Sequence, residues 1–411
     1  MKSANYKLPA YLMVLMSVIG FTLLCAANAW QLNVLYVGLG FLALFVLIYS
    51  ILVLCSMGDK FLVLIAFMLM TVGVLMLCRL DIVMGARQIL WIAVGGIVFF
   101  LTYCIFYNIR FWNRLWLLYA VFGTALFVLT LVFGKTVNGS RNWIDLGPID
   151  FQPSEIIKIL YIMFLACKYS GSWSKPFLHV SPTIMTGIVT YTYILFLVFQ
   201  RDWGTILVVF LIFIFMIYVY EDTKWFLPAN MLAAIIVGCL GYLFLHHIQV
   251  RVNVWLNPWN DVPNTGYQIA QSLFAIASGG YFGRGLGNGA PDYIPEVHTD
   301  FIFSGICEEL GVFGGAAIII LYFLFAYRCF KITLNTQNSY NKAVGLGLTL
   351  MFAFQTFIII GGVIKFIPLT GITLPFVSYG GTSIVVSFAS LGIMQAISAL
   401  EVRHGGAEND K

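Results

Sequence analysis

The sequence predicts an all-α polytopic membrane protein, and two observations lead to this fold class. The chain of 411 residues is 61% hydrophobic and only 9% charged, with a mean hydropathy of +0.94. Soluble domains carry about a quarter charged residues, so this composition argues against a soluble fold. Apolar runs close to the 20 residues that span a bilayer as a helix recur along almost the whole chain. No stretch reads as a separate soluble domain, so residues 1–411 are expected to form one membrane domain.

About twelve segments are expected to cross the membrane as helices. They lie at 10–29, 34–57, 60–78, 88–108, 114–133, 154–169, 183–200, 205–220, 227–246, 301–327, 343–366 and 374–400. The segment that begins at Ser154 is among the shortest of these.

The distribution of Lys and Arg predicts the orientation of the spans. With both termini in the cytoplasm, the inner connections hold more Lys and Arg than the outer ones, as the positive-inside rule requires. The net charge of +5 is then explained by the Lys and Arg residues of the inner connections. No nucleic-acid-binding module or Walker motif occurs, so a nucleic-acid partner is not expected. The predicted location is the plasma membrane, with membrane lipids as neighbours.

Polar residues gather in three stretches, which all fall on the predicted outer side. The stretches are 134–158, 200–205 and 247–300. The third is a large extracytoplasmic loop that is too rich in Trp, Tyr and Phe to be a disordered tail. Trp and Tyr suit the headgroup region, so an interfacial or re-entrant loop is expected.

A fourth stretch, 368–383, breaks the helical pattern at membrane depth. Pro368 and Pro375 interrupt helices, and Gly380 and Gly381 permit close backbone approach. Irregular backbone at this depth must be buried in protein or line a cavity. The stretch therefore predicts a polar cavity.

Together, these four stretches resemble the SEDS family of shape, elongation, division and sporulation proteins over about 60–403. The motifs that carry the resemblance occur in family order. They are Gln152-Pro153-Ser154-Glu155 with Lys158, Gly266 to Ser272, Pro295-Glu296 with His298-Thr299-Asp300-Phe301, and Pro375 to Gly381 including Ser378 and Tyr379.

The resemblance implies a glycosyltransferase that polymerises lipid II into β-1,4-linked glycan strands at the outer membrane face. It implies a core of ten helices in 60–403, which leaves 1–59 as an additional N-terminal helix pair. It also implies a partner, a class B penicillin-binding protein, because this chain lacks the transpeptidase set of S-x-x-K and K-T-G motifs. The cellular role stays open between elongation, division and sporulation.

Asp300 is the strongest candidate for a catalytic residue, and two interpretations of it are open. As a helix N-cap it would accept backbone N–H groups, a contribution of ~1 kcal/mol. The resemblance instead places the family's catalytic aspartate here, as a general base for the sugar 4-hydroxyl. The pyrophosphate leaving group is already a stable anion, so one carboxylate suffices. Asp300, Ser304 and Glu308 are spaced to share one helix face.

Further residues are expected to bind substrate or to shape the site. Glu155 and Lys158 are spaced to form an ion pair on one helix, with Lys158 or Arg141 near a phosphate. Three roles remain open for Glu296: contact with the substrate, a ligand of a cation, or a solvated loop carboxylate. Glu308 is expected to have a structural role or to line a cavity, and Glu309 to pair with a neighbouring helix. The remaining candidates from the motifs and polar stretches are Asp202, Arg251, His298, Ser378 and Tyr379.

The pyrophosphate of lipid II requires compensating positive charge. The outer cations that could supply it are Arg141, Lys158, Arg201, Arg251, Arg284 and Lys365. The alternative for each is snorkelling to lipid headgroups. A divalent cation, Mg²⁺ or Mn²⁺, stays an open further source of charge. The sequence predicts no dedicated metal site and no organic cofactor.

The sequence departs from the family pattern at three positions. Arg201 and Trp203 stand where the family has Pro and Leu, in Gln-Pro-Asp-Leu-Gly-Thr. Asn142 stands where many members have Arg before the loop tryptophan. Two rival functions remain: a lipid II flippase or other transporter, which broken spans and intramembrane carboxylates also suit, and a non-catalytic cell-wall scaffold.

Overall fold

The computed structural model describes residues 6–27, 30–137, 139–145, 147, 150–177 and 179–409, with side chains as far as residue 401. The end of the first predicted span, 28–29, lies outside these residues. Contacts group the chain into two compact units. The first comprises Met1–Asn108, Gln271–Thr336 and Thr373–Lys411, and the second Ile109–Ala270 and Gln337–Ile372. That 1–411 forms one domain stays a prediction.

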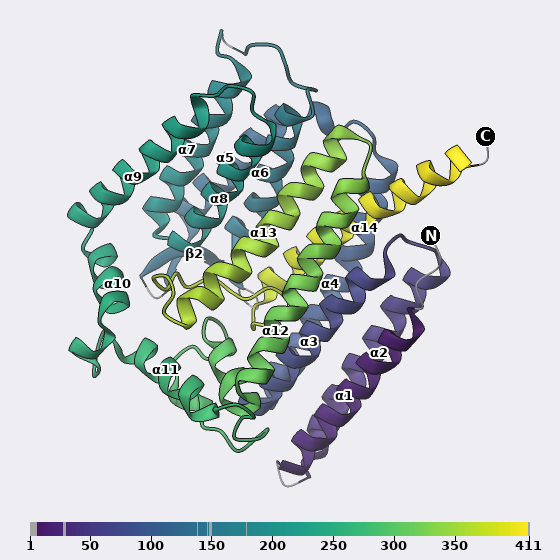
Figure 1. Ribbon diagram of the computed structural model, residues 1–411, viewed down its shortest axis with the longest axis vertical. Coiled ribbons are helices and arrows are strands. Elements are labelled where there is room, and N and C mark those ends of the chain that lie inside the picture. The colour runs from purple at the N-terminus through teal and green to yellow at the C-terminus, as the bar shows by residue number, and fades with distance from the viewer. Residues whose placement is uncertain are drawn as a thin grey trace. The chain divides into compact units, whose positions relative to one another are not determined.

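The first unit is built around two helices that are buried on most sides, α3 and α14. α4 packs along α14, and α12 packs against both α3 and α14. Figure 1 shows α1 and α2 side by side next to α3. The helices of this unit are α1 (Lys7–Ala27), α2 (Leu32–Leu54), α3 (Lys60–Leu80), α4 (Ile82–Asn108), the 3-10 turn Pro291–Tyr293, α12 (Ile302–Asn335) and α14 (Gly381–Asn409).

The second unit is built around α13, which packs against α6 and α8. α5 lies against α6, α7 against α8, and α9 against both α8 and α10. Its elements are the 3-10 turn Trp112–Arg114, α5 (Trp116–Phe133), β1 (Lys135–Val137), β2 (Ser140–Asp145), β3 (Asp150–Phe151), α6 (Pro153–Tyr169), α7 (Pro182–Gln200), α8 (Trp203–Tyr220), α9 (Phe226–Phe244), α10 (His246–Leu256), the 3-10 turn Pro258–Asp261 and α13 (Ser339–Val363). α11 (Tyr267–Gly279) crosses from this unit into the first.

The all-α, polytopic fold class is confirmed, and the protein is a multi-pass membrane protein. Among the described residues, eleven helices are long and apolar enough to cross a membrane. They coincide with eleven of the twelve predicted spans. The twelfth, α6, has 17 residues and is shorter than the others.

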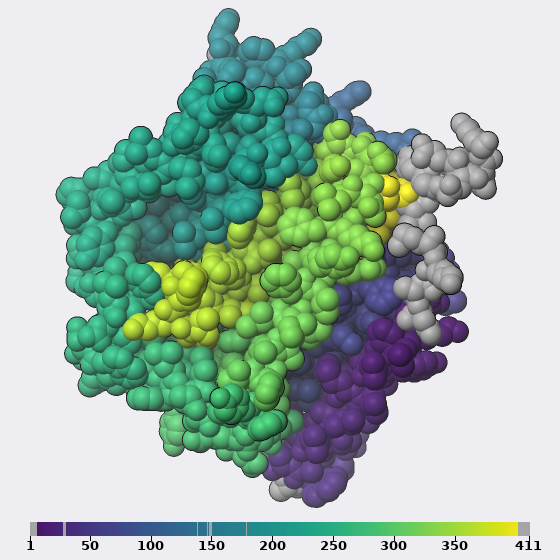
Figure 2. Space-filling view, viewed as in Figure 1, coloured from purple at the N-terminus to yellow at the C-terminus, as the bar shows by residue number. Residues whose placement is uncertain are grey.

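The N-terminal helix pair, α1 and α2, packs onto α3 and α4 through one face. The Ser17 and Thr71 hydroxyls, both buried, lie 3.2 Å apart and link α1 to α3. The opposite face of the pair exposes large apolar side chains such as Leu12, Leu15 and Leu47. These helices form the purple surface in Figure 2. Such a face suits contact with lipid or with another membrane helix.

Two predicted outer stretches contain more regular structure than a loop. The three short strands β1, β2 and β3 form an antiparallel sheet in that order, in which Lys135 forms ion pairs with Asp145 and Asp150. The Asp150 and Asp145 carboxylates raise the pKa of the Lys135 ammonium. The stretch 247–300 contains most of α10, all of α11 and two 3-10 turns, so it is ordered as expected.

A kink at Gly311 divides α12 and brings the loop after α11 against it. Gly311 has φ 70°, and a Cβ atom here would collide with the Tyr281 carbonyl oxygen. The kink leaves backbone groups of α12 without partners inside the helix, and the loop supplies them. Arg284 N–H donates to the Glu308 carbonyl at 3.0 Å, and Val312 N–H donates to the Gly280 carbonyl at 2.9 Å. The kink therefore anchors the segment that leads to Asp300.

Replacing Gly392 by Ala should destabilise the protein. Gly392 lies on α14 where it meets α4, and a Cβ atom would be 2.5 Å from the Phe99 carbonyl oxygen. Overpacking of this kind costs about 1–3 kcal/mol, more than the gain in helix propensity of about 0.5–1 kcal/mol. A lower melting temperature of the purified variant in detergent is the expected result.

The matched control for this substitution is Gly238→Ala on α9. Nothing lies within 4 Å of a Cβ atom at Gly238. Its melting temperature should be unchanged or raised. If Gly392→Ala melts at the same temperature as Gly238→Ala, the close approach of α4 and α14 is refuted.

Candidate active site

Asp300 lies in the turn that leads into α12, where its side chain is half-buried. The chain reverses at Glu296, which has φ 56°, and the carbonyl of Glu296 accepts from Thr299 N–H at 3.1 Å. Because this turn continues to Phe301, the helix begins only at Ile302 and its cap position is Phe301. The N-cap interpretation of Asp300 is therefore wrong, and so is the inference that Asp300 shares one face of this helix with Ser304 and Glu308.

The turn that carries Asp300 is fastened to the irregular segment before α14. The Ser378 hydroxyl donates to the Thr299 carbonyl at 2.6 Å and accepts from Leu374 N–H at 2.9 Å. Tyr379 N–H donates to the His298 carbonyl at 2.8 Å, and the two rings lie 6.0 Å apart. Residues from two predicted motifs, far apart in sequence, are thus brought together around Asp300.

The side chain of Glu296 belongs to the same turn. Its Oε2 atom lies 3.8 Å from His298 Nε2 and accepts from the Thr299 hydroxyl at 3.3 Å. The side chain remains 39% exposed. Glu296 therefore places a second partly exposed carboxylate close to Asp300 in the chain.

Two buried glutamates on α12 hold the loop before Asp300. Arg79 Nε lies 2.8 Å from Glu309 Oε1, whose other oxygen accepts from Gly287 N–H at 3.1 Å. Glu308 Oε1 accepts from Ala290 N–H at 3.0 Å and lies 3.7 Å from Arg284 Nη1. The structural role expected for Glu308, and the pairing of Glu309 with a neighbouring helix, are confirmed.

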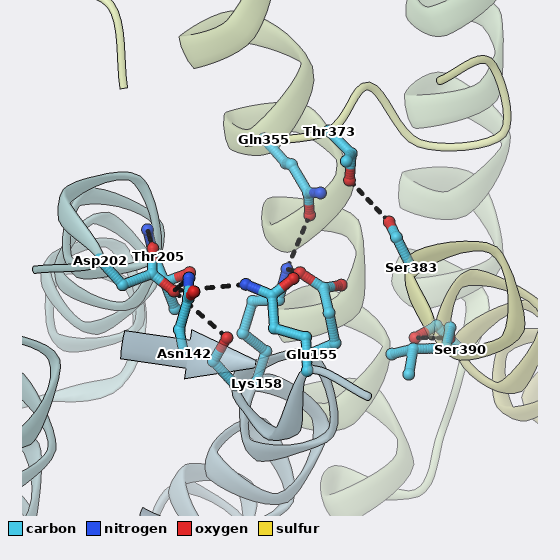
Figure 3. A network of polar contacts seen from close by, with 12 residues as sticks. Asn142, Glu155, Lys158, Asp202, Thr205, Gln355, Thr373, Ser383 and Ser390 are labelled. Carbon is cyan, nitrogen blue, oxygen red and sulfur yellow. Dashed lines mark hydrogen bonds and ion pairs between the residues drawn. The ribbon is translucent and has the colours of Figure 1, made fainter. Parts of the chain in front are cut away.

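A second polar cluster lies in the other unit, at the start of α6. Lys158 Nζ donates to Glu155 Oε1 at 2.8 Å and to Gln355 Oε1 on α13 at 3.1 Å (Figure 3). Lys158 is only 2% exposed, and Glu155 and Gln355 are also buried. Pro153 occupies the first turn of α6, so that the acidic Glu155 stands where the helix dipole favours it. The predicted ion pair is confirmed.

Asp202 joins three elements of this unit. Its Oδ1 atom caps α8 by accepting from Thr205 N–H at 3.1 Å. Its Oδ2 atom accepts from the Ser154 hydroxyl at 3.2 Å and the Asn142 amide at 3.4 Å (Figure 3). Asn142, one of the departures from the family pattern, thereby links β2 to α8. Asp202 therefore holds α6, α8 and β2 together through hydrogen bonds, and its role toward a substrate stays a prediction.

Two of the predicted arginines of this unit, Arg141 and Arg251, donate hydrogen bonds to backbone carbonyls. Arg141 donates to Gly134 O at 2.8 Å and to Val132 O at 3.3 Å, so it satisfies carbonyls at the end of α5. Arg251 Nη1 donates to Leu369 O at 2.9 Å. That Lys158 or Arg141 lies near a phosphate stays a prediction.

Sequence reasoning missed several polar side chains that hold these clusters. Gln355 accepts from Lys158, and Gln88 Nε2 donates to the Ser378 carbonyl at 3.2 Å. Both are amide side chains within helices that are otherwise mostly apolar. That pattern marks a side chain facing the protein interior and could have identified them.

No group of three or more His, Cys, Asp or Glu side chains is placed to hold a metal ion in the part of the chain that the structure describes.

A double-mutant cycle on Glu155 and Lys158 should reveal strong coupling. Lys158→Met leaves a buried carboxylate without its ion-pair partner, which costs about 3–5 kcal/mol. Glu155→Gln/Lys158→Met removes both charges and should be more stable than the sum of the single effects predicts. Unfolding of the purified variants in detergent measures each step. Effects that simply add would show that the two charges act separately.

The comparisons with known proteins give one family. A family model described as "Cell cycle protein" and named for FtsW, RodA and SpoVE matches residues 59–402. Peptidoglycan glycosyltransferase RodA of Mycobacterium tuberculosis (strain ATCC 25618 / H37Rv) is 32% identical over 369 residues, covering 83% of this chain and 78% of the relative. Stage V sporulation protein E of Bacillus subtilis (strain 168) is 34% identical over 362 residues, covering 83% and 96%.

Solved structures agree with this result. RodA of Thermus thermophilus is similar with a TM-score of 0.61 and 26% identity, covering 83% of this chain and 96% of that one. A chain from the structure reported as "Structural coordination of polymerization and crosslinking by a peptidoglycan synthase complex" has a TM-score of 0.72 and 27% identity, covering 84% and 98%. The resemblance carried by the four polar stretches is thus confirmed, and the chain belongs to the FtsW/RodA/SpoVE family of SEDS proteins.

Proposed function

We propose that this protein is a peptidoglycan glycosyltransferase that polymerises lipid II into β-1,4-linked glycan strands, with Asp300 as its general base. Family membership and the names of its relatives support the activity. The observation that carries the residue assignment is the turn around Asp300. Its neighbours His298 and Thr299 are fixed by Tyr379 and Ser378, while the Asp300 side chain stays partly exposed.

The chemistry needs one well-placed base. The 4-hydroxyl of the acceptor sugar attacks C1 of the donor, and the bond from C1 to the pyrophosphate oxygen breaks. An Asp300 carboxylate oxygen takes the hydroxyl proton. The lipid pyrophosphate departs as a stable anion, so no acid is needed to protonate it. A single displacement converts the α-linked donor into a β-1,4 bond.

The negative charge of the pyrophosphate is compensated mainly by arginine and lysine side chains. Mg²⁺ or Mn²⁺ would add charge if bound between phosphate oxygens, water and one carboxylate, for which Glu296 is the nearest choice in sequence. No organic cofactor takes part.

The reaction takes place on the outer face of the cytoplasmic membrane, with both termini in the cytoplasm. The distribution of Lys and Arg over the connections supports this orientation. The partner is a class B penicillin-binding protein, which crosslinks the strands. A structural neighbour reported as part of a peptidoglycan synthase complex supports such a pairing.

Asp300→Asn should abolish glycan synthesis. The amide keeps the size of the side chain and its hydrogen-bonding oxygen, so the turn should persist, but the amide cannot accept the hydroxyl proton. The measurement is the length distribution of glycan made from labelled lipid II, together with the melting temperature of the variant.

The matched control is Asp292→Asn, since the Asp292 carboxylate is 63% exposed and lies eight residues earlier. Its glycan synthesis should stay near the wild-type rate. Wild-type glycan synthesis by Asp300→Asn would refute the general-base assignment, whatever the control shows.

Cysteine labelling in intact cells should confirm the orientation. In a background without the exposed native Cys55, Cys104 and Cys239, a cysteine at Asn288 should react with a membrane-impermeant thiol reagent. A cysteine at Ser174, also exposed in the fold, should react only after the cells are opened. The reverse pattern would place Asp300 on the cytoplasmic side and remove it from the proposed reaction.

A further inference from the structure

A group of cationic side chains meets at the ends of three membrane spans in the second unit. α7 ends at Gln200, α8 begins at Trp203, and α10 begins at His246, directly after α9. Because successive spans alternate in direction, these three ends lie at the same membrane surface. This is the level at which the phosphate groups of lipids lie.

Contacts made by members of the group or by their chain neighbours bring several elements together here. The rings of Trp203 and His247 lie 5.1 Å apart. A Cβ atom at Gly204, next to Trp203, would be 3.3 Å from Thr370 Cβ. Arg251 donates to the carbonyl of Leu369, the residue before Thr370. α8, α10 and the segment after α13 therefore converge here.

Three buried polar atoms of this group make no hydrogen bond to the described part of the chain. They are Trp203 Nε1, His247 Nε2 and Thr370 Oγ1. The Thr370 side chain is only 7% exposed. Buried polar groups are nearly always paired, so three orphans in one place call for an explanation. The indole can only donate, and the other two atoms can donate, so an acceptor suits all three.

The charge of the group favours an anionic acceptor. Arg201 is exposed, with φ 59°, and its guanidinium has no ion-pair partner among the described residues. The nearby carboxylate of Asp202 is already hydrogen-bonded to Ser154 and to Thr205 N–H. Burial first, and then Arg201, Arg251 and His246, lower the pKa of His247. Apart from Asp202, the charged groups around this imidazole are thus cationic.

We propose that Arg201, Trp203, His247, Arg251 and Thr370 form a binding site for the phosphate group of a membrane lipid. A tetrahedral phosphate offers several acceptor oxygens to the two guanidinium groups and the three orphan donors. Two sources share this chemistry: the headgroup of an anionic phospholipid and the pyrophosphate of a polyprenyl lipid. Only the second rests on the proposed function, and binding is measured below without activity, so that the two proposals can fail separately.

The site makes lipid binding depend on pH. A bound anion stabilises the protonated imidazole of His247, so binding raises the pKa of this group and takes up a proton. Affinity should therefore increase as the pH falls from 8 to 6. Phosphatidylglycerol suits this measurement because its phosphodiester does not titrate in that range.

The test is native mass spectrometry of the full chain in neutral detergent, titrated with phosphatidylglycerol, phosphatidylcholine or undecaprenyl pyrophosphate. The wild type should prefer phosphatidylglycerol to phosphatidylcholine. Arg201→Asn should weaken phosphatidylglycerol binding about tenfold or more, since Asn tolerates the left-handed backbone but carries no charge. His247→Asn should remove the pH dependence. Lys175→Gln, which removes an exposed charge elsewhere in the same unit, should bind like the wild type.

Trp203→Phe and Thr370→Val provide a second pair, because each deletes one donor and nearly keeps the shape. Both substitutions should weaken the binding of phosphatidylglycerol. They test the proposal if Arg201→Asn does not fold. Tighter binding of undecaprenyl pyrophosphate than of phosphatidylglycerol assigns the site to a polyprenyl lipid, and the reverse order assigns it to a phospholipid headgroup. Equal phosphatidylglycerol binding by the wild type and all folded variants, or equal binding of phosphatidylglycerol and phosphatidylcholine by the wild type, would overturn the proposal.

Discussion

The hydrogen bond from the Ser378 hydroxyl to the Thr299 carbonyl is the constraint on which the candidate active site depends. It joins the turn before α12 to the irregular segment before α14, next to the bond from Tyr379 N–H to the His298 carbonyl. Neither segment is helical, so its backbone groups need partners outside a helix, and each segment supplies them to the other. The position of Asp300 follows from this exchange, since the residue comes directly after the two carbonyls that are held.

Buried ion pairs then fix the surroundings of each cluster. Arg79 with Glu309 holds the loop before Asp300, and Lys158 with Glu155 joins the start of α6 to Gln355. Asp59 caps α3 and also pairs with Arg328 on α12. An unpaired charge in such surroundings is costly, so these pairs specify one arrangement of the helices more than they add net stability. Some polar residues of this apolar chain thus hold helices and loops in place, and others are available for the proposed reaction.

The sequence predicted the spans well because hydrophobic length is a local property. It placed the start of α6 within one residue of Pro153 and predicted the Glu155–Lys158 pair from spacing alone. The sheet at 135–151 was not predicted, because its strands are only two to six residues long. The kink of α12 at Gly311 was not predicted either, since it depends on contacts with the loop around Gly280 and Arg284.

Resemblance found the residues that carry family motifs, such as Asp300 and Ser378. It could not identify Gln355 or His247, because the importance of each lies in its neighbours: Lys158 for the first and Trp203 for the second. The structure likewise adds a role for Arg141 that its motif does not indicate, because its guanidinium donates to two backbone carbonyls at the end of α5.

Glycan polymerisation by the purified wild-type chain is the most direct test of the central claim. The chain is incubated with labelled lipid II and a candidate class B penicillin-binding protein whose transpeptidase site is blocked, and the products are separated by length. A ladder of glycan strands is the predicted result. Movement of intact lipid II across a bilayer, with no ladder under the same conditions, would contradict the account and identify a flippase instead.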